Sequence, residues 1–145
     1  MQPVTVVRSG DGELIDAGGV QHLFLLTGGR LGVERFAVPP ATVGARPHVH
    51  GSHDEHFYVL TGTLTLATED GETALHAGDL AAAPRGSVHG YRNASPDTPA
   101  TALCLYTPPG YEQYFRDVHA AAADGAEVTP ELLAELRSRY DTESR

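Results

Sequence analysis

This sequence has few of the features that usually reveal where a small protein resides. It contains one cysteine, Cys104, in 145 residues, so no disulfide can form within the chain and a cysteine-rich zinc site is excluded. No apolar run approaches the ~18 residues of a membrane-spanning helix. The first residues lack a basic segment followed by an apolar one. We therefore expect a cytoplasmic protein without a signal peptide.

Basic residues are also scarce. Ten Lys and Arg stand against nineteen Asp and Glu, which gives a formal net charge of -9. Nucleic acids favour stripes of basic side chains, and anionic lipid surfaces attract clusters of them. We therefore expect neither as a partner, and a small molecule remains the best candidate for what this chain binds.

Turn-forming residues, in contrast, are abundant. The 16 glycines and ten prolines favour many short strands joined by tight turns. Between them lie apolar or alternating segments, and we expect strands at residues 4–7, 20–26, 31–38, 57–60, 63–66, 73–75, 80–83, 88–93 and 100–106. This spacing predicts an all-β protein, a barrel or jelly roll of about ten strands.

The period of the apolar residues changes after residue 110. Tyr111, Tyr114 and Val118 fall at helical spacing. A second helix is expected to begin at Thr129–Pro130, because a hydroxyl N-cap followed by proline is a typical helix start. We therefore expect residues 1–110 to form the barrel and residues 111–145 to form helices packed on it within the same domain.

The segment around His48 concentrates side chains that bind metals. His48 and His50 lie two residues apart, which places both rings on one face of a strand. Glu55 has the opposite parity, but Gly51–Ser52 can host a bulge or bend that turns its carboxylate to the same side. His89 is the candidate for a fourth ligand. Three imidazoles and one carboxylate are a suitable ligand set for a divalent metal.

Two segments resemble the two sequence motifs of the cupin family. The first motif, His-x-His, four residues, Glu, six residues, Gly, is matched by His48, His50, Glu55 and Gly62. The second, Gly, five residues, Pro-x-Gly, two residues, His, three residues, Asn, is matched by Gly78, Pro84, Gly86, His89 and Asn93. The family has a glycine six positions before the first histidine, whereas this chain has Thr42 there and Gly44 nearer. We expect this departure to affect only a turn.

The resemblance implies a single-domain cupin, a jelly-roll barrel that holds one metal ion at His48, His50, Glu55 and His89. The ligand types suit iron, nickel, manganese, cobalt, copper or zinc and do not name the metal. Octahedral coordination would leave positions open for water, substrate or dioxygen. Cupins are often dimers joined through edge strands, which implies a homodimer with Val4–Val7 as a plausible exchanged edge.

The tail from Pro108 to Phe115 is similar to that of cupins related to quercetin 2,3-dioxygenase. This second resemblance implies a metal-dependent dioxygenase acting on a small aromatic or polyketide-like hydroxy-ketone. It also implies that Glu55 is the base that takes the substrate's hydroxyl proton, and a raised pKa in a dry cavity would suit that role. Two alternatives stay open: a cyclase, isomerase or lyase that uses the same metal as a Lewis acid, and a non-catalytic small-molecule-binding cupin.

Several apolar and aromatic side chains are candidates for a substrate pocket, although core packing is the simpler explanation for each of them. They are Phe57, Val59, Tyr91, Tyr111 and Phe115. His53, between the ligands, could orient a ligand or act as an auxiliary base, but a solvated loop histidine is the simpler interpretation. Cys104 lies inside an apolar strand and is expected to be an inert buried thiol.

Overall fold

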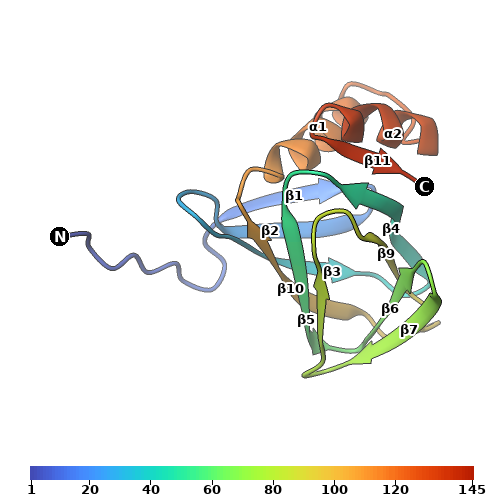
Figure 1. Ribbon diagram of the computed structural model, residues 1–145, viewed down its shortest axis with the longest axis horizontal. Helices are drawn as coiled ribbons and strands as arrows, with labels where there is room; N and C mark the ends of the chain where they lie inside the picture. Colours follow the sequence, from blue (N-terminus) through green and yellow to red (C-terminus); the bar gives the residue numbers. More distant parts are fainter.

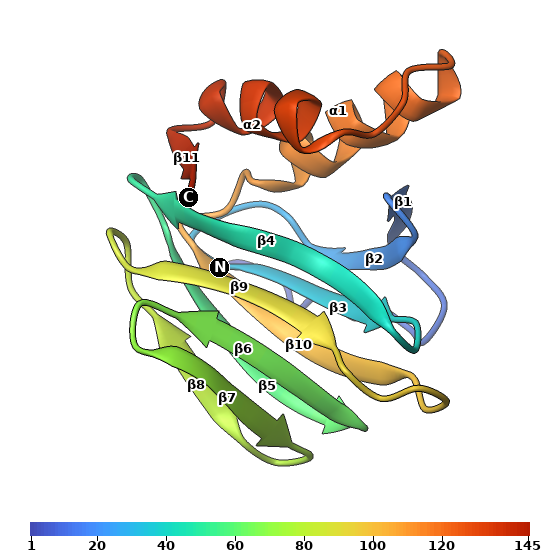
Figure 2. The same cartoon turned by 90° about the vertical axis from the view of Figure 1, so that its right-hand side faces the viewer.

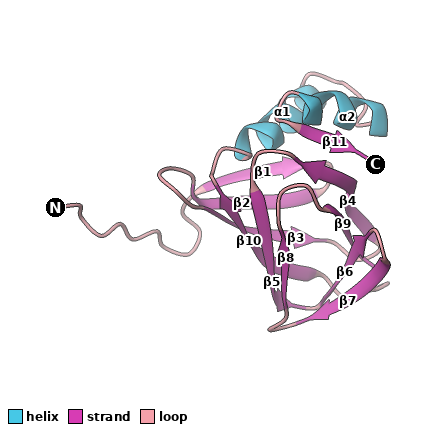
Figure 3. Ribbon diagram, in the orientation of Figure 1, coloured by secondary structure: helices cyan, strands magenta, loops and turns pink.

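Two antiparallel β-sheets face each other in the computed structural model, which describes residues 1–145 (Figures 1 and 3). The first sheet runs, in spatial order, β1 (Glu13–Ala17), β2 (Val20–Leu26), β3 (Gly32–Val38), β10 (Ala100–Thr107), β5 (Asp54–Thr61) and β8 (Leu80–Ala83). The second runs β11 (Thr142–Ser144), β4 (Thr42–His50), β9 (Val88–Asn93), β6 (Thr63–Thr68) and β7 (Gly71–His76). The predicted all-β jelly roll is confirmed, with two open sheets in place of a fully closed barrel.

Alternation along the strands decides which side chains fill the space between the sheets. Every second residue of β10 is buried, from Ala100 to Tyr106. β2 and β3 alternate in the same way, so each places one row of side chains inward. Cys104 belongs to the inward row, and burial raises the pKa of its thiol well above the usual value. The inert buried thiol predicted from the sequence agrees with this position.

Two helices cover one end of the sheets (Figure 2). They are α1 (Glu112–Ala123) and α2 (Pro130–Ser138). The Thr129 side chain accepts a hydrogen bond from the Leu132 amide at 3.1 Å, which confirms the predicted start of α2. Arg116 of α1 forms an ion pair with Glu13 of β1 at 2.6 Å. Neither helix has the length and apolar character of a membrane span.

The chain ends with a short strand, β11, that the sequence analysis did not anticipate. It pairs with β4 so that Thr142 lies opposite His50 and Ser144 opposite His48. Three residues are too few to give a recognisable period, and the pairing depends on where α2 ends. As a result, the C-terminal tail is joined to the strand that carries two of the candidate metal ligands.

The N-terminal segment differs from its prediction. Val4–Val7 forms no strand, and Val4 is 91 % exposed. A strand needs a hydrogen-bonded partner, and β1 pairs within this chain only with β2. The missed strand β1 contains two acidic residues and joins β2 through Gly18–Gly19, both with positive φ angles suited to a tight hairpin turn. The dimer exchanged through Val4–Val7 stays a prediction.

Candidate metal centre

The four candidate ligands come from three strands in two sheets. His48 and His50 lie on β4, and His89 lies opposite His48 on the neighbouring strand β9. Glu55 lies on β5 in the facing sheet. Of the predicted bulge or bend at Gly51–Ser52, the structure has a bend: β4 ends at His50, and the chain bends at these two residues and crosses to the other sheet.

The ligand atoms of these four side chains meet at one buried point. They all lie within 4.8 Å of one another, and all four residues are buried. The Nε2 atoms of His48 and His50 are 3.1 Å apart. Glu55 Oε1 lies 2.9 Å from His50 Nε2, and Glu55 Oε2 lies 3.2 Å from His89 Nε2. Two atoms that each bind one ion at about 2.1 Å are separated by roughly 3.0–3.4 Å, so the spacing suits a shared metal.

Hydrogen bonds at the other ring nitrogen determine the tautomer of each histidine. His48 Nδ1 donates to the carbonyl oxygen of Arg46 at 2.7 Å. His50 Nδ1 donates to the Thr142 hydroxyl at 2.8 Å, and that hydroxyl donates in turn to a backbone carbonyl. His89 Nδ1 points at the carbonyl of Ser87, at a longer 3.4 Å. Each Nε2 atom is therefore left with a lone pair that faces the common point.

This arrangement of lone pairs fits a cation. Two neutral imidazoles cannot hydrogen-bond through Nε2 atoms that both lack a proton, and a carboxylate repels such atoms. Burial, together with the charges of neighbouring histidines, holds the pKa of His48 well below its usual value. Burial also lowers the pKa of His50. The rings thus resist protonation, and a divalent metal ion is the group that this donor set can hold.

Glu55 differs from its prediction in one respect. Burial alone would raise its pKa, but its contacts with His50, His53 and His89 outweigh burial, and the pKa of Glu55 lies well below its usual range. The raised pKa that would suit a base is therefore not found. An ionised carboxylate suits a metal ligand, and its role as a base stays a proposal.

The lowered histidine pKa values predict that the metal-free chain loses stability in mild acid. In the unfolded chain these histidines titrate near 6.5, whereas in the folded chain their pKa values are lower. Below about pH 6.5 the unfolded chain therefore binds more protons, and the free energy of unfolding falls as the pH falls. Urea unfolding of chelator-treated protein at pH 7 and about pH 5.5 measures this. Equal or greater stability at the lower pH would contradict the expected direction.

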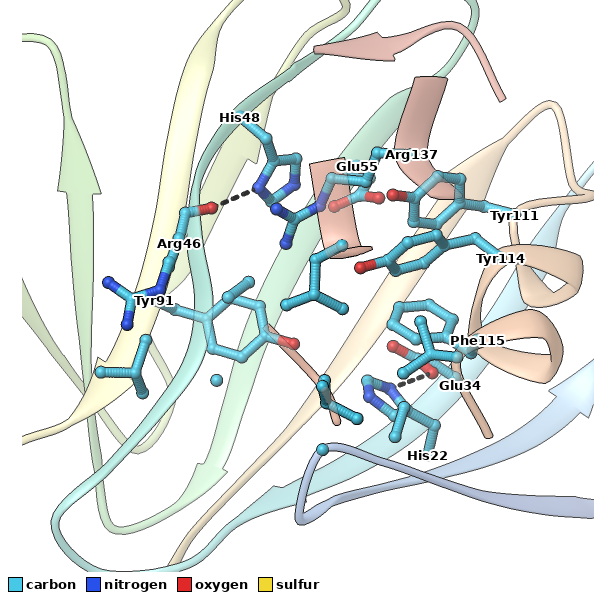
Figure 4. A pocket seen from close by; sticks show the side chains of 18 of the residues that line it. His22, Glu34, Arg46, His48, Glu55, Tyr91, Tyr111, Tyr114, Phe115 and Arg137 are labelled. Carbon is cyan, nitrogen blue, oxygen red and sulfur yellow. Dashed lines mark hydrogen bonds and ion pairs between the residues drawn. The ribbon is translucent and has the colours of Figure 1, made fainter. Parts of the chain in front are cut away.

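A cavity of about 200 Å³ adjoins the ligand cluster (Figure 4). His48 and Glu55 form part of its wall, and aromatic side chains form much of the rest. Of the candidates for the substrate pocket, four line this cavity: Phe57, Tyr91, Tyr111 and Phe115. Val59 does not, because it packs in the core with no exposed surface.

His53 also lies outside this cavity, but it is not the solvated loop residue that the sequence suggested. It is 6 % exposed, and its Nε2 donates to Glu55 Oε1 at 2.9 Å. Its ring also packs, tilted, against His50 and Tyr111. His53 lines a separate hollow. Its hydrogen bond orients the Glu55 carboxylate.

The sequence analysis missed a second buried polar group on the cavity wall. His22 Nδ1 lies 2.9 Å from Glu34 Oε2, and the Tyr106 hydroxyl donates to Glu34 Oε1 at 2.7 Å. Phe115 stacks on His22 with ring centroids 3.9 Å apart. The sequence did contain a signal for this group. Side chains of β3 alternate between inward and outward, and Glu34, two residues before Phe36, lies in the inward row. A buried glutamate requires an internal partner.

The departure from the family motif near Gly44 does not lie in a turn, because residues 42 and 44 belong to strand β4. A Cβ atom at Gly44 would collide with the ring of Tyr91, which is buried and cannot swing outward. We expect Gly44→Ala to push this ring into the cavity and to lower the free energy of unfolding by about 1–3 kcal/mol. In Gly28→Ala, the matched control, the new methyl group meets no atom within 4 Å. Urea unfolding of both variants measures the difference, and equal stability would contradict the clash.

Comparison with known proteins supports a common family. Residues 34–106 match the family described as Cupin domain. A quercetin 2,3-dioxygenase from Aspergillus japonicus is 31 % identical over 87 residues, which are 57 % of this chain and 24 % of that protein. The chain thus spans about a quarter of the length of that relative.

Solved structures share the fold. KdgF from Halomonas sp. has a TM-score of 0.67 at 23 % identity, over 75 % of this chain and 99 % of that chain. A sugar phosphate isomerase of the cupin superfamily from Silicibacter pomeroyi has a TM-score of 0.64 at 26 % identity, over 71 % of this chain and 75 % of that chain. The jelly roll, the two motifs and the match over half of the residues lead to one conclusion: this chain belongs to the cupin domain family.

Proposed function

We propose that this protein is a metal-dependent cupin dioxygenase that acts on a small aromatic or polyketide-like hydroxy-ketone. The observation that carries this proposal is the buried cluster of three Nε2 atoms and one carboxylate beside an aromatic cavity. The similarity to a quercetin 2,3-dioxygenase adds support for the type of reaction. Because the similarity covers a quarter of that protein, the substrate and the reaction are proposals for this chain.

Different residues of the chain would hold the metal, orient the substrate and accept the hydroxyl proton of the substrate. His48, His50, His89 and Glu55 would hold the metal, which supplies Lewis-acid charge when bound. The aromatic wall, with Tyr91 and Phe115 on opposite sides, would orient a flat ring and exclude water. Glu55 would accept the hydroxyl proton of the substrate, because its carboxylate is ionised and lies on the cavity wall.

The second candidate is a non-oxidative cupin isomerase, cyclase or lyase. It is favoured by the coverage of a solved isomerase structure and by the volume of the cavity. The isomerase with 26 % identity is matched over three quarters of its own chain. A cavity of about 200 Å³ also falls below the common range of about 300–1,000 Å³ for sites that hold drug-sized ligands. The coverage supports a likeness to that isomerase, and the cavity volume favours a small substrate.

Oxygen consumption separates the two candidates. We expect the metal-loaded protein to consume dioxygen with hydroxy-ketones of one or two rings, and to convert none of them under strict anoxia. Turnover that persists without oxygen would reject the dioxygenase in favour of the isomerase class. If no chelator-sensitive turnover is found with or without oxygen, the third alternative, a non-catalytic binding cupin, is favoured.

A further inference from the structure

One buried cation on the cavity wall has no acidic partner. Arg137, in the last turn of α2, is 4 % exposed and lines the same cavity as His48 and Glu55. In Figure 4 its guanidinium points toward the end of the cavity that these two residues line. Five other arginines form ion pairs, and all of them are largely exposed: Arg85, Arg92, Arg116, Arg139 and Arg145. Arg137 is the buried arginine, and it forms none.

The buried carboxylates are engaged elsewhere. Glu34 is bound by His22 and Tyr106, and Glu55 by the candidate metal cluster. The contacts of Arg137 are neutral: Nη1 donates to the Ser144 hydroxyl at 3.2 Å, and its Cζ lies 5.6 Å from the ring centroid of Tyr114. A buried charge that lacks a counter-charge is costly, and neutral contacts offset only part of that cost.

Unpaired polar atoms also gather at this place. Three buried side-chain atoms have no hydrogen-bond partner, namely His56 Nδ1, Tyr111 Oη and Arg137 Nε. Two of the three, on Tyr111 and Arg137, belong to residues of the cavity wall. Both atoms are donors, and a buried donor without an acceptor usually indicates that a ligand or water supplies one. The cavity thus presents a charged and a neutral donor in need of an anionic oxygen.

We propose that Arg137 and the Tyr111 hydroxyl bind a carboxylate group of the substrate, so that the small aromatic hydroxy-ketone of the proposed function also carries a carboxylic acid. The proposal rests on the proposed function in taking this cavity as the substrate site. Guanidinium and carboxylate match in charge and in planar geometry. Tyr91, Tyr114 and Phe115 would enclose the ring that carries the acid.

The chemistry of the wall favours a carboxylate over a phosphate. A single guanidinium neutralises a monoanion, whereas a phosphate ester carries nearly two charges and needs further donors. Arg46, the other arginine on the cavity wall, is exposed. The remaining wall is largely aromatic and aliphatic. In the metal-free chain, a dianion in this cavity would leave uncompensated charge.

Binding of two isosteric probes tests the proposal without any turnover. We expect 4-hydroxybenzoate to bind the full chain at least about tenfold more tightly than 4-hydroxybenzamide, by calorimetry. The preference should persist in chelator-treated protein, because Arg137 does not depend on the metal. A preference that vanishes with the metal would assign the carboxylate to the metal and overturn the role of Arg137. Tighter binding of phenyl phosphate would overturn the choice of carboxylate.

Two variants test whether the Arg137 side chain causes the preference for the carboxylate over the amide. In Arg137→Met we expect the carboxylate to lose at least about tenfold in affinity, while the amide changes by less than about twofold. Arg139→Met is the matched control, since Arg139 lies two residues away and pairs on the surface with Glu135. Equal losses in both variants would overturn the proposal. If Arg137→Met fails to fold, the ratio between acid and amide in the unaltered chain still decides. A dioxygenase assay can fail while this preference holds, so the two proposals are tested separately.

Discussion

Replacing His48 with alanine is expected to reduce the bound metal from about one ion per chain to less than about a tenth of that amount. The variant removes one of three imidazoles whose Nε2 atoms converge, and the remaining set leaves the metal more exposed to exchange. Changes to residues that merely orient a ligand cost about 10–100-fold in metal affinity, so loss of the ligand itself should cost at least about 100-fold. Metal-dependent turnover should fall in proportion.

Elemental analysis of variants purified in parallel measures this loss. His76→Ala is the matched control, because His76 is an exposed histidine on β7 that is not part of the cluster. Circular dichroism of the chelator-treated His48→Ala protein checks that the fold persists, since β4 pairs with β9 through backbone groups. Equal metal content in both variants would show that His48 is no ligand.

Glu55→Gln is expected to have the second large effect, a loss of at least about 100-fold in turnover at saturating metal. The amide keeps the shape of the side chain but removes the negative charge and the ability to accept a proton. If Glu55 serves both as ligand and as base, added metal restores occupancy but not turnover. If it serves only as ligand, added metal restores both.

Metal titration followed by steady-state kinetics distinguishes these outcomes. Glu34→Gln is the matched control, because Glu34 is a buried carboxylate on the same cavity wall that does not touch the cluster. This variant should retain full metal content. Glu55→Gln protein that turns over substrate normally without added metal would contradict both roles for Glu55.

The resemblance to the two cupin motifs indicated the ligand set, because the motif residues occupy strand positions that the fold brings together. His48 and His89 face each other across β4 and β9, which the separation of the two motifs in sequence does not reveal. Glu55 lies beside the three histidines in the structure, and the chain bends at Gly51–Ser52, one of the two possibilities that the sequence suggested there. A family motif indicates which side chains meet in the fold, but it does not indicate the backbone path that brings them together.

The polar groups at the cavity were harder to predict because their partners are distant in sequence. Glu34 meets Tyr106 from a strand more than 70 positions further along the chain. Arg137 follows Leu133 by one helical turn, so it shares the inward face of α2, yet an arginine near a helix C-terminus is ordinarily explained by the helix dipole. Only the packing of α2 over the sheets places this charge beside the cavity.

Strand predictions succeeded where the chain pairs with itself. β2, β8 and β9 were predicted with the bounds that the structure has. Val4–Val7 has the composition of a strand but finds no partner in this chain, and composition carries no information about partners. Size-exclusion chromatography tests whether a second copy supplies one.

The metal content of untagged protein, purified without added metal and analysed for all first-row transition metals, tests the central claim most directly. We expect about one ion per chain, released by chelators and recovered on adding back the same metal. A chain that carries no metal, and that binds none of these ions when they are supplied in excess, would contradict it.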